Sequence, residues 1–453
     1  MGKMPMPDLI ARHAVVIGAG MAGLSAAKAV GPYFDKVVVL DRDALPHGPA
    51  PRAGTPQARH AHGLLTGGQK ALEELFPGIE SELAKVGAVS LNVGDIIVER
   101  PGHDPFPRRD FGFDTLCLSR PLLESVCRRR LREERNVEFR PHCRVMELIP
   151  SSDNVAVASV RYENEKGAPD ALLAGFVVDA SARAAPTLSL LKTIDAPKLE
   201  ESEIGIDIGY ATAIFEVPDD ASAERKCVMH MPAPPDVSRG GLILPIEDNR
   251  WIVSLSGRHG DAPPGEIEGF LAFTKTLRTP TIHEALRKAK PVGEVARYNL
   301  PCSVRRRFER LEQFPRGVIP IGDSVCRFNP VFGQGMSVAA MEAVVLGKLL
   351  ASRRDHADPL DGLAADYFSK IQACLESPWA TAETDFVYPQ TRGERPKDFA
   401  GRLQYGAALT RLMADDPEAH RTVVEVVNLV RPLSALRQPE LVERVMALMK
   451  AAA

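Results

Sequence analysis

Residues 14–27 read Ala-Val-Val-Ile-Gly-Ala-Gly-Met-Ala-Gly-Leu-Ser-Ala-Ala, and residues 36–42 read Lys-Val-Val-Val-Leu-Asp-Arg. An apolar strand, a glycine turn, a helix of small residues and a second apolar strand ending in an acid follow one another here. This order is the dinucleotide-binding fingerprint in its structural context. Gly18 permits the tight turn, Gly20 lets a pyrophosphate approach the backbone amides, and Gly23 lets the helix pack closely on the strand.

The acid at the end of the second strand belongs to the same site. Asp41 follows the turn by about 20 residues, the spacing at which a carboxylate accepts hydrogen bonds from the adenosine ribose. The neighbouring residues that we expect to contact the cofactor are Met21, Ala22 and Arg42. The fingerprint alone does not distinguish FAD from NAD.

Residues 317–336 carry a second motif, which favours FAD. An apolar strand ends in Gly322-Asp323, a loop follows, and a helix begins near Gly335. Such a loop places Asp323 against ribityl hydroxyls and directs helix-start amides at the N1–C2=O edge of a flavin. Two sites so far apart in the chain suit a long cofactor, so we expect non-covalent FAD. The expected contacts of this loop are Asp323, Pro330, Gly333, Gln334, Gly335 and Met336.

The chain resembles the class A flavin monooxygenases, the para-hydroxybenzoate hydroxylase type. The matching stretches are the two motifs above together with residues 51–62, 119–124 and 378–389. The most similar branch is the bacterial one that contains polyether epoxidases and relatives of polyprenyl-phenol hydroxylases. The resemblance covers nearly the whole chain. It implies that reduced FAD and O2 form a C4a-hydroperoxide, which hydroxylates or epoxidises a hydrophobic aromatic or alkene substrate. NADH, NADPH or a partner flavin reductase would supply the electrons.

One segment departs from that family. Where the family has Asp-Gly, or Asp-Ala-Thr-Gly-Arg in the most similar branch, this chain reads Asp179-Ala180-Ser181-Ala182-Arg183. The family motif is linked to both FAD and the reduced pyridine nucleotide. The departure therefore leaves the identity of the reductant open, whereas FAD binding is still expected.

The order of patterns predicts an α/β fold in which a Rossmann-like FAD-binding domain is interleaved with a β-sheet substrate domain and followed by a helical C-terminal region. Residues 241–246 and 251–256 form a plausible hairpin, and Pro389 and Pro396 interrupt the C-terminal helices. The expected division is FAD-binding domain in 1–90, 119–190 and 301–358, substrate domain in 91–118 and 191–300, and helical region in 359–453.

Composition fits a soluble cytoplasmic enzyme. The formal net charge is −3 with 25% charged residues, so we expect no nucleic-acid partner. The seven cysteines include no Cys-x-x-Cys and indicate neither a disulfide framework nor a metal site. No apolar run reaches the roughly 18 residues of a membrane span, and the first eight residues are too polar for a signal peptide. The arginine runs 128–130 and 305–307 suggest solvated helix faces; oligomeric state is unreadable.

Three further residues have both a functional and a structural interpretation. Arg52, in a loop rich in proline and glycine, would meet the FAD pyrophosphate or remain an ordinary loop arginine. Arg120, just before an expected helix, has the same two interpretations. Val145 would offer backbone groups to adenine, although core packing alone explains a valine there.

The catalytic candidates are His60 and Pro330. His60 and His62 share a loop that, in the family, runs toward the isoalloxazine, so a histidine there would orient substrate or assist a proton transfer. Hydrogen bonding within the loop, without chemistry, is the alternative for both. Pro330 and residues 333–336 would form the wall beside the oxygen site.

Three other functions use the same cofactor domain. A flavin-dependent halogenase is one, but its Trp-x-Trp-x-Ile-Pro motif is missing, because Trp251 and Trp379 stand alone. A reductase of the geranylgeranyl-reductase type would saturate alkenes, and a non-catalytic flavoprotein would perform no reaction. Apolar residues expected on the middle strands favour a hydrophobic substrate: Ile206, Ile208, Tyr210, Ile214, Leu242 and Leu244.

Overall fold

The computed structural model describes residues 9–219 and 227–451. Its centre is a five-stranded parallel sheet in the order β16-β10-β1-β2-β6. The valine-rich segments of its three central strands are buried on both faces, as a parallel sheet between two layers requires. The strands are β1 (Ala11–Ile17), β2 (Phe34–Leu40), β6 (Val137–Arg140), β10 (Phe176–Asp179) and β16 (Val318–Pro320).

Two layers cover this sheet. Alternate residues such as Val16 and Val39 pack against helices, whereas Val15 and Val38 pack against a three-stranded sheet and α5 on the opposite face. The helices on or near the first face are α1 (Met21–Val30), α2 (Thr66–Leu75), α3 (Ile79–Lys85), α4 (Arg120–Arg132), α8 (Gly335–Ser352) and α9 (Leu363–Ala382). The opposite layer contains β7 (Arg144–Pro150), β8 (Val157–Glu163), β9 (Pro169–Leu173) and α5 (Ala185–Thr193).

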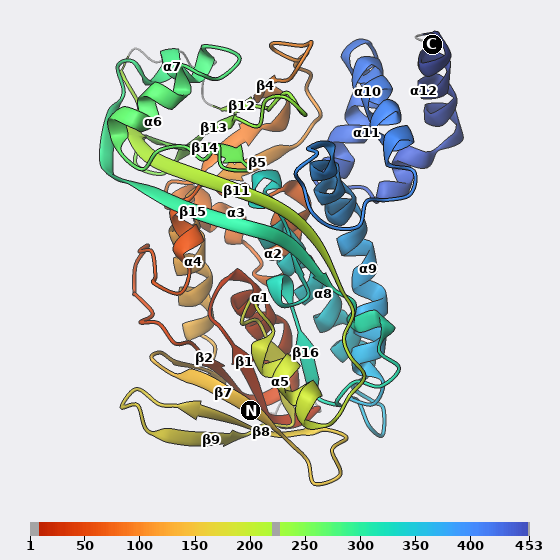
Figure 1. Cartoon of the computed structure of the whole chain (residues 1–453). Coiled ribbons are helices and arrows are strands. Elements are labelled where there is room, and N and C mark those ends of the chain that lie inside the picture. The colour runs from red at the N-terminus through yellow and green to blue at the C-terminus, as the bar shows by residue number, and fades with distance from the viewer. Residues whose placement is uncertain (1–8, 220–226, 452–453) are drawn as a thin grey trace, which may run out of the picture.

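A seven-stranded mixed sheet forms the second unit, above the first in Figure 1. Its long strands β11 (Glu201–Glu216) and β15 (Lys290–Arg306) pair along most of their length and lead down toward the parallel sheet. The other strands are β4 (Ile97–Glu99), β12 (Val228–His230), β13 (Gly240–Ile246), β14 (Arg250–Arg258) and β17 (Cys326–Arg327). The expected hairpin is confirmed, because Ile246 pairs with Arg250 in the antiparallel pair β13–β14.

The two faces of the seven-stranded sheet differ. One face packs Phe215 and Trp251 against α6 (Ile267–Thr274) and α7 (Thr281–Leu286). The other carries Ile214, Leu242 and Leu244 toward the lobe that contains β3 (Val89–Asn92) and β5 (Asp114–Cys117). This second face is the apolar surface expected for the middle strands.

The C-terminal region is helical, as expected. After α9, a loop containing Pro389 and Pro396 leads to α10 (Phe399–Asp415), α11 (Pro417–Val427) and α12 (Pro439–Ala451). These three helices bury a small core of their own, into which Phe106, from the loop between β4 and β5, inserts. Figure 1 shows them beside the seven-stranded sheet.

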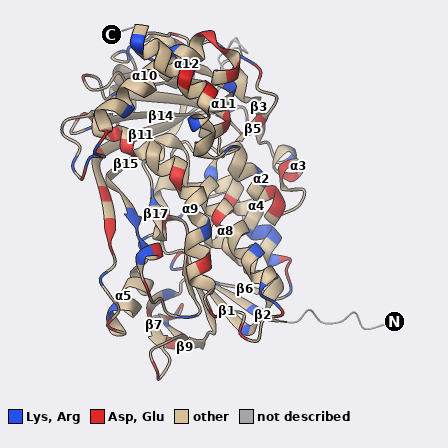
Figure 2. Ribbon diagram, turned by 90° about the vertical axis from the view of Figure 1, so that its right-hand side faces the viewer, with Lys and Arg blue, Asp and Glu red and all other residues tan. Residues whose placement is uncertain are grey.

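The expectation for the arginine runs is wrong in part: Arg129 is exposed on α4, but Arg128 and the run 305–307 do not lie on solvated helix faces. Arg128 is fully buried in α4 and donates to the carbonyl of Pro46, while Arg305 and Arg306 lie at the end of strand β15. The guanidinium of Arg128 is buried because a backbone acceptor compensates its desolvation. Figure 2 shows acidic and basic residues spread over the elements, with basic residues along α4.

Helix α8 alone, within the described residues, is long and apolar enough by length and composition to cross a membrane. It is a core helix, packed against α1, α2 and α9 in the main hydrophobic core.

Candidate FAD site

The glycine turn after β1 has the geometry that the fingerprint predicts. Gly18 has φ +97°, and a Cβ there would lie 2.8 Å from the carbonyl oxygen of Ala180. A Cβ on Gly23 would lie 1.8 Å from the Gly18 carbonyl oxygen, so helix and turn touch backbone to backbone. At Gly20 a Cβ would meet, among the described residues, one atom within 4 Å, an Nη atom of Arg120 at 3.6 Å. Gly20 is thus free of close backbone packing, in contrast to the other two glycines.

The amino end of α1 follows this turn. Its N-cap residue is Gly20, no side chain caps it, and its first turn has no acidic residue. The free amides and the helix dipole of such an end attract an anion. Open space at Gly20 and an uncapped helix start are the requirements for binding a pyrophosphate.

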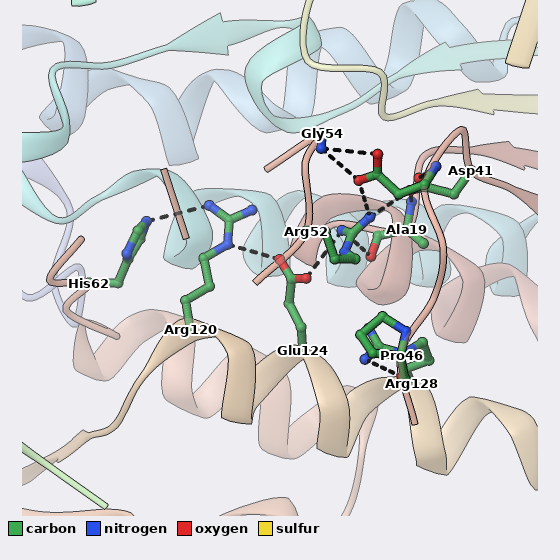
Figure 3. Close-up of polar contacts among 10 residues, drawn as sticks. Ala19, Asp41, Pro46, Arg52, Gly54, His62, Arg120, Glu124 and Arg128 are labelled. Atoms are coloured by element: carbon green, nitrogen blue, oxygen red, sulfur yellow. Dashed lines mark hydrogen bonds and ion pairs between the residues drawn. The ribbon is translucent and has the colours of Figure 1, made fainter. Parts of the chain in front are cut away.

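Asp41 lies at the centre of a buried ionic network (Figure 3). Its Oδ2 accepts from the backbone N–H of Ala19 at 2.6 Å and from Arg52 Nη1 at 3.1 Å, and its Oδ1 accepts from the N–H of Asp43. A carboxylate offers about four acceptor positions, so Asp41 retains capacity for one ribose hydroxyl. Its role toward ribose stays a prediction.

Arg52 is held by three carboxylates. Its two terminal nitrogens donate to Asp41 and Asp43 and to Glu124 and the carbonyl of Ala19, at distances from 3.1 to 3.2 Å. Only Nε lacks a partner among the described residues. Removing such a buried cation leaves several carboxylates uncompensated, at a cost of about 3–5 kcal/mol. The structure therefore places Arg52 as a link between the strand end and α4, and contact with the pyrophosphate stays a prediction.

Arg120 is the guanidinium beside the glycine turn. It occupies the first position of α4, behind the N-cap Ser119, and its Nε donates to Glu124 at 2.9 Å. Its Nη1 lies 3.4 Å from His62 Nε2, and Figure 3 shows this row of side chains from His62 to Arg52. Glu124 thereby orients both arginines, a role that the sequence indicates only through its position four residues after Arg120.

Asp323 lies in the short 3-10 helix Gly322–Ser324 that follows β16. No described residue hydrogen-bonds to its carboxylate. Burial raises the pKa of this carboxyl, while the positive charges of Arg120, Arg327 and Arg306 lower it. A Cβ on Gly335 would lie 3.7 Å from Asp323 Oδ1, so this acceptor faces the start of α8. Arg120 and Asp323 are thus close enough to interact electrostatically, although they are far apart in the chain.

The loop between Asp323 and α8 is fixed from three directions. Asn329 accepts from the hydroxyl of Tyr210 at 2.7 Å and from the N–H of Val331, and donates to Asp385 at 2.8 Å. Arg258 of β14 pairs with the same Asp385. This network, which sequence reasoning missed, joins the seven-stranded sheet, the loop and the residues after α9.

The remaining loop residues surround the start of α8. Pro330 is exposed in the 3-10 turn Pro330–Phe332, and Gly333 has φ +66°. Gln334 is the N-cap of α8 without a capping side-chain bond, and Met336 is buried. Two uncapped helix starts, α1 and α8, therefore accompany the two cofactor motifs.

His60 and His62 lie in the loop before α2, which contacts both β14 and the first turn of α8. His60 Nδ1 is 2.7 Å from Thr212 Oγ1, and His62 Nδ1 is 2.8 Å from the carbonyl of His60. Burial lowers the pKa of His60 to about 4; burial, followed by the charge of Arg120, lowers that of His62 to about 3. Both imidazoles are therefore neutral near pH 7.

The Asp179 segment keeps a glycine-like backbone despite its alanines. Asp179 is buried and accepts from Ser181 N–H and from the hydroxyl of Thr187, which ties it to the first turn of α5. Ala182 and Ala184 have φ of +69° and +53°. Ala182 thus adopts the left-handed conformation that favours glycine.

Val145 and Arg42 are the least distinctive candidates. Val145 is half-buried on β7 against the cluster that contains Tyr162, so packing accounts for its side chain. Arg42 is exposed beside Asp41. Contacts of either residue with the adenosine half stay predictions.

No family model matches the chain. The chain is 34% identical over 358 residues to protein Rv3254 of Mycobacterium tuberculosis. The matched region covers 75% of this chain and 73% of Rv3254. The chain belongs to the same family as Rv3254.

The fold of this chain is similar to that of several solved structures. A flavoprotein/dehydrogenase from Cytophaga hutchinsonii has a TM-score of 0.68 at 14% identity, covering 98% of this chain and all of that one. The flavin-dependent brominase Bmp2 gives 0.66 at 15% identity and 98% coverage of both chains. The p-nitrophenol 4-monooxygenase PnpA from Pseudomonas putida gives 0.62 at 20% identity, over 92% of this chain and 98% of that one. The fold is that of the class A flavin monooxygenases and flavin-dependent halogenases.

Proposed function

We propose that the chain is an FAD-dependent oxidoreductase, specifically a monooxygenase that inserts one oxygen atom from O2 into a hydrophobic aromatic or alkene substrate. The observation that carries the proposal is the convergence of the open glycine turn at Gly20, the guanidinium of Arg120 and the unpaired carboxylate of Asp323. Each suits a different part of one long cofactor, and the flavin-dependent brominase Bmp2 has a similar fold.

The residues present fit FAD. The amides after Gly20, with Arg120, would hold the pyrophosphate, Asp41 the adenosine ribose, and Asp323 the ribityl chain. The start of α8, with Gly333, Gln334, Gly335 and Met336, would face the flavin ring. FAD supplies, when reduced, the electrons that activate O2. We infer that NADH, NADPH or a partner flavin reductase reduces it, and that the protein acts in the cytoplasm.

The chain's own contribution is to position substrate and exclude water. The face of the seven-stranded sheet that carries Tyr210, Ile214 and Leu242 would cover the substrate opposite the flavin loop. Pro330 would form the wall beside the reacting oxygen, and His60 would contact the substrate. Removing water strengthens each hydrogen bond made in this space.

The halogenase, reductase and non-catalytic flavoprotein alternatives would keep the same cofactor contacts. Oxygen uptake in the presence of reductant separates them, because a reductase of the geranylgeranyl-reductase type and a non-catalytic protein add no oxygen to a product. A halogenase requires halide for product formation, whereas the proposed monooxygenase does not.

Flavin binding is tested with two glycine variants. Gly20→Val places a branched side chain where the pyrophosphate approaches, whereas Gly48→Val changes an exposed glycine that meets no atom within 4 Å. We expect purified wild type and Gly48→Val to release FAD absorbance on denaturation and filtration, and folded Gly20→Val to release little. Wild-type protein that binds NAD tightly and no FAD would contradict the proposal.

A further inference from the structure

The carboxyl group of Glu342 holds the backbone at the start of the loop that carries Asp323. Glu342 lies in α8 and is fully buried, and its Oε2 accepts from the backbone N–H of Gly322 at 2.6 Å. Gly322 has φ +62°, and a Cβ there would lie 2.8 Å from the Cβ of Ala22 in the first turn of α1. This hydrogen bond therefore fixes the residue at which the two cofactor motifs touch.

The other carboxyl oxygen of Glu342 faces the core. Oε1 has no hydrogen-bond partner among the described residues. Burial raises the pKa of Glu342 to about 8, while the hydrogen bond from Gly322 lowers it and the charge of Asp323 raises it further. Two carboxylates that interact in a buried site do not both ionise readily, because like charges repel strongly where water is excluded. Asp323 can therefore be ionised at least cost when Glu342 is neutral.

The other titratable groups that interact with Glu342 stay neutral near pH 8. Burial raises the pKa of Cys374 in α9 to about 12 and raises the pKa values of Tyr367 in α9 and Cys326 in β17 well above their ordinary values. On α1, α2 and α9, which pack on α8, the charged residues all lie at exposed or half-buried positions: Lys28, Lys70, Glu73, Glu74, Asp366, Lys370 and Glu376. The cations that interact with Asp323 are Arg120, Arg327 and Arg306. Glu342 is thus the member of this buried group that exchanges a proton near pH 8.

Bound FAD would favour the neutral form of Glu342. In the proposed function, the pyrophosphate dianion lies beside Arg120, the first of the cations that lower the pKa of Asp323. The flavin would also cover the loop and remove water from it. Added negative charge and lost water both disfavour a second carboxylate beside Asp323.

We propose that Glu342 is a positioning residue whose carboxyl group must be neutral in the FAD-bound protein, so that binding of oxidised FAD above pH 8 takes up one proton at Glu342. This inference rests on the proposed function and adds a proton-linked step to cofactor loading. The proton comes from the buffer and the flavin stays oxidised, so no electron is transferred.

Proton uptake is measured by isothermal titration calorimetry of flavin-free protein with FAD, in buffers that differ in ionisation enthalpy. We expect the wild type to take up about half a proton at pH 8 and nearly one at pH 9, and its Kd for FAD to rise up to about tenfold from pH 7 to 9. Glu342→Gln keeps an acceptor for Gly322 but cannot ionise, so both effects should be lost. Glu440→Gln, at an exposed position of α12, should behave as the wild type.

The possible failures are distinguishable. FAD binding with the same proton uptake in wild type and Glu342→Gln would overturn the inference and leave the proposed function standing. Absence of FAD binding at every pH would refute the proposed function and this inference together. If Glu342→Gln does not fold, the wild type alone decides, because FAD binding without proton uptake at pH 9 contradicts the proposal.

Discussion

Asp323 is the residue on which the proposed flavin contact depends most directly. Its carboxylate is exceptional in the site because Asp41, Glu124 and Asp385 are all paired with arginines, whereas no described residue hydrogen-bonds to the carboxylate of Asp323. An unpaired, largely buried carboxylate costs free energy that hydroxyl donors of a ligand would offset.

Asp323→Ala is expected to weaken FAD binding by roughly ten- to a hundredfold, which corresponds to losing a charge-assisted hydrogen bond of about 1.5–3 kcal/mol. The fold should survive, because no described hydrogen bond depends on this side chain. Fluorescence titration of FAD measures the affinity, with Asp355→Ala on the exposed surface as control. Equal affinity in the two variants would assign Asp323 a structural role only.

Ala182 is an alanine in a left-handed backbone conformation. Its φ of +69° lies in the region that favours glycine. The left-handed conformation costs an alanine about 1–2 kcal/mol, which a glycine would not pay. Glycine, however, increases the entropy of the unfolded state, and this offsets about 0.4–1 kcal/mol of the relief.

We therefore expect Ala182→Gly to raise the free energy of unfolding by up to about 1.6 kcal/mol. Ala365→Gly, at an exposed position inside α9, should instead lower it by about 1 kcal/mol. Urea denaturation of both variants measures the difference. Destabilisation by Ala182→Gly similar to that by Ala365→Gly would refute the strain argument.

At the scale of elements, Glu342 of α8 connects the core to Gly322, at the start of the loop that carries Asp323. Glu342 Oε2 accepts from the backbone N–H of Gly322, next to Asp323, at 2.6 Å, while Oε1 has no partner among the described residues. Burial raises the pKa of Glu342 from 4.5 to about 8. The native state therefore holds a proton there that the unfolded state releases near pH 4.5.

A raised native pKa means that stability is fully present below pH 4.5 and is lost as pH rises toward 8. Glu342→Gln cannot ionise but keeps an acceptor for Gly322. We expect the variant to gain roughly 1–4 kcal/mol relative to wild type between pH 5 and 8. Denaturant unfolding at several pH values measures this, and parallel pH profiles for the two proteins would show that Glu342 is ionised in the native state.

The elements were predictable where a local pattern determines them. The glycine turn, the β13–β14 hairpin and the C-terminal helices follow from turn residues and periodicity. The buried state of Arg128 was not, because a run of arginines looks solvated until the carbonyl of Pro46 is known to lie beside it.

Side-chain pairing within the site was equally hidden. The motifs identify Asp41 and Asp323, but only the folded chain shows that the terminal nitrogens of Arg52 donate to carboxylates. The Asn329 network joins residues 210, 329 and 385, whose sequence separations of 119 and 56 carry no local signal. Tertiary partners over such separations are decided by the whole fold.

At the scale of the molecule, the chain leaves the parallel sheet, builds the seven-stranded sheet and returns through β16 to complete the flavin loop (Figure 1). This interleaving brings His60, Tyr210 and Asn329 together from three separate segments. The hydrogen bond between Tyr210 and Asn329 holds the apolar face of the seven-stranded sheet beside the loop that precedes α8.

The most direct test of monooxygenase activity is mass spectrometry of product formed under labelled O2, with reductant and a hydrophobic aromatic substrate that the protein turns over. The account predicts one labelled oxygen atom in the product, in the absence of halide. An unlabelled product that has gained hydrogen, or a halogenated product formed only with halide, would contradict the monooxygenase assignment while leaving the FAD site intact.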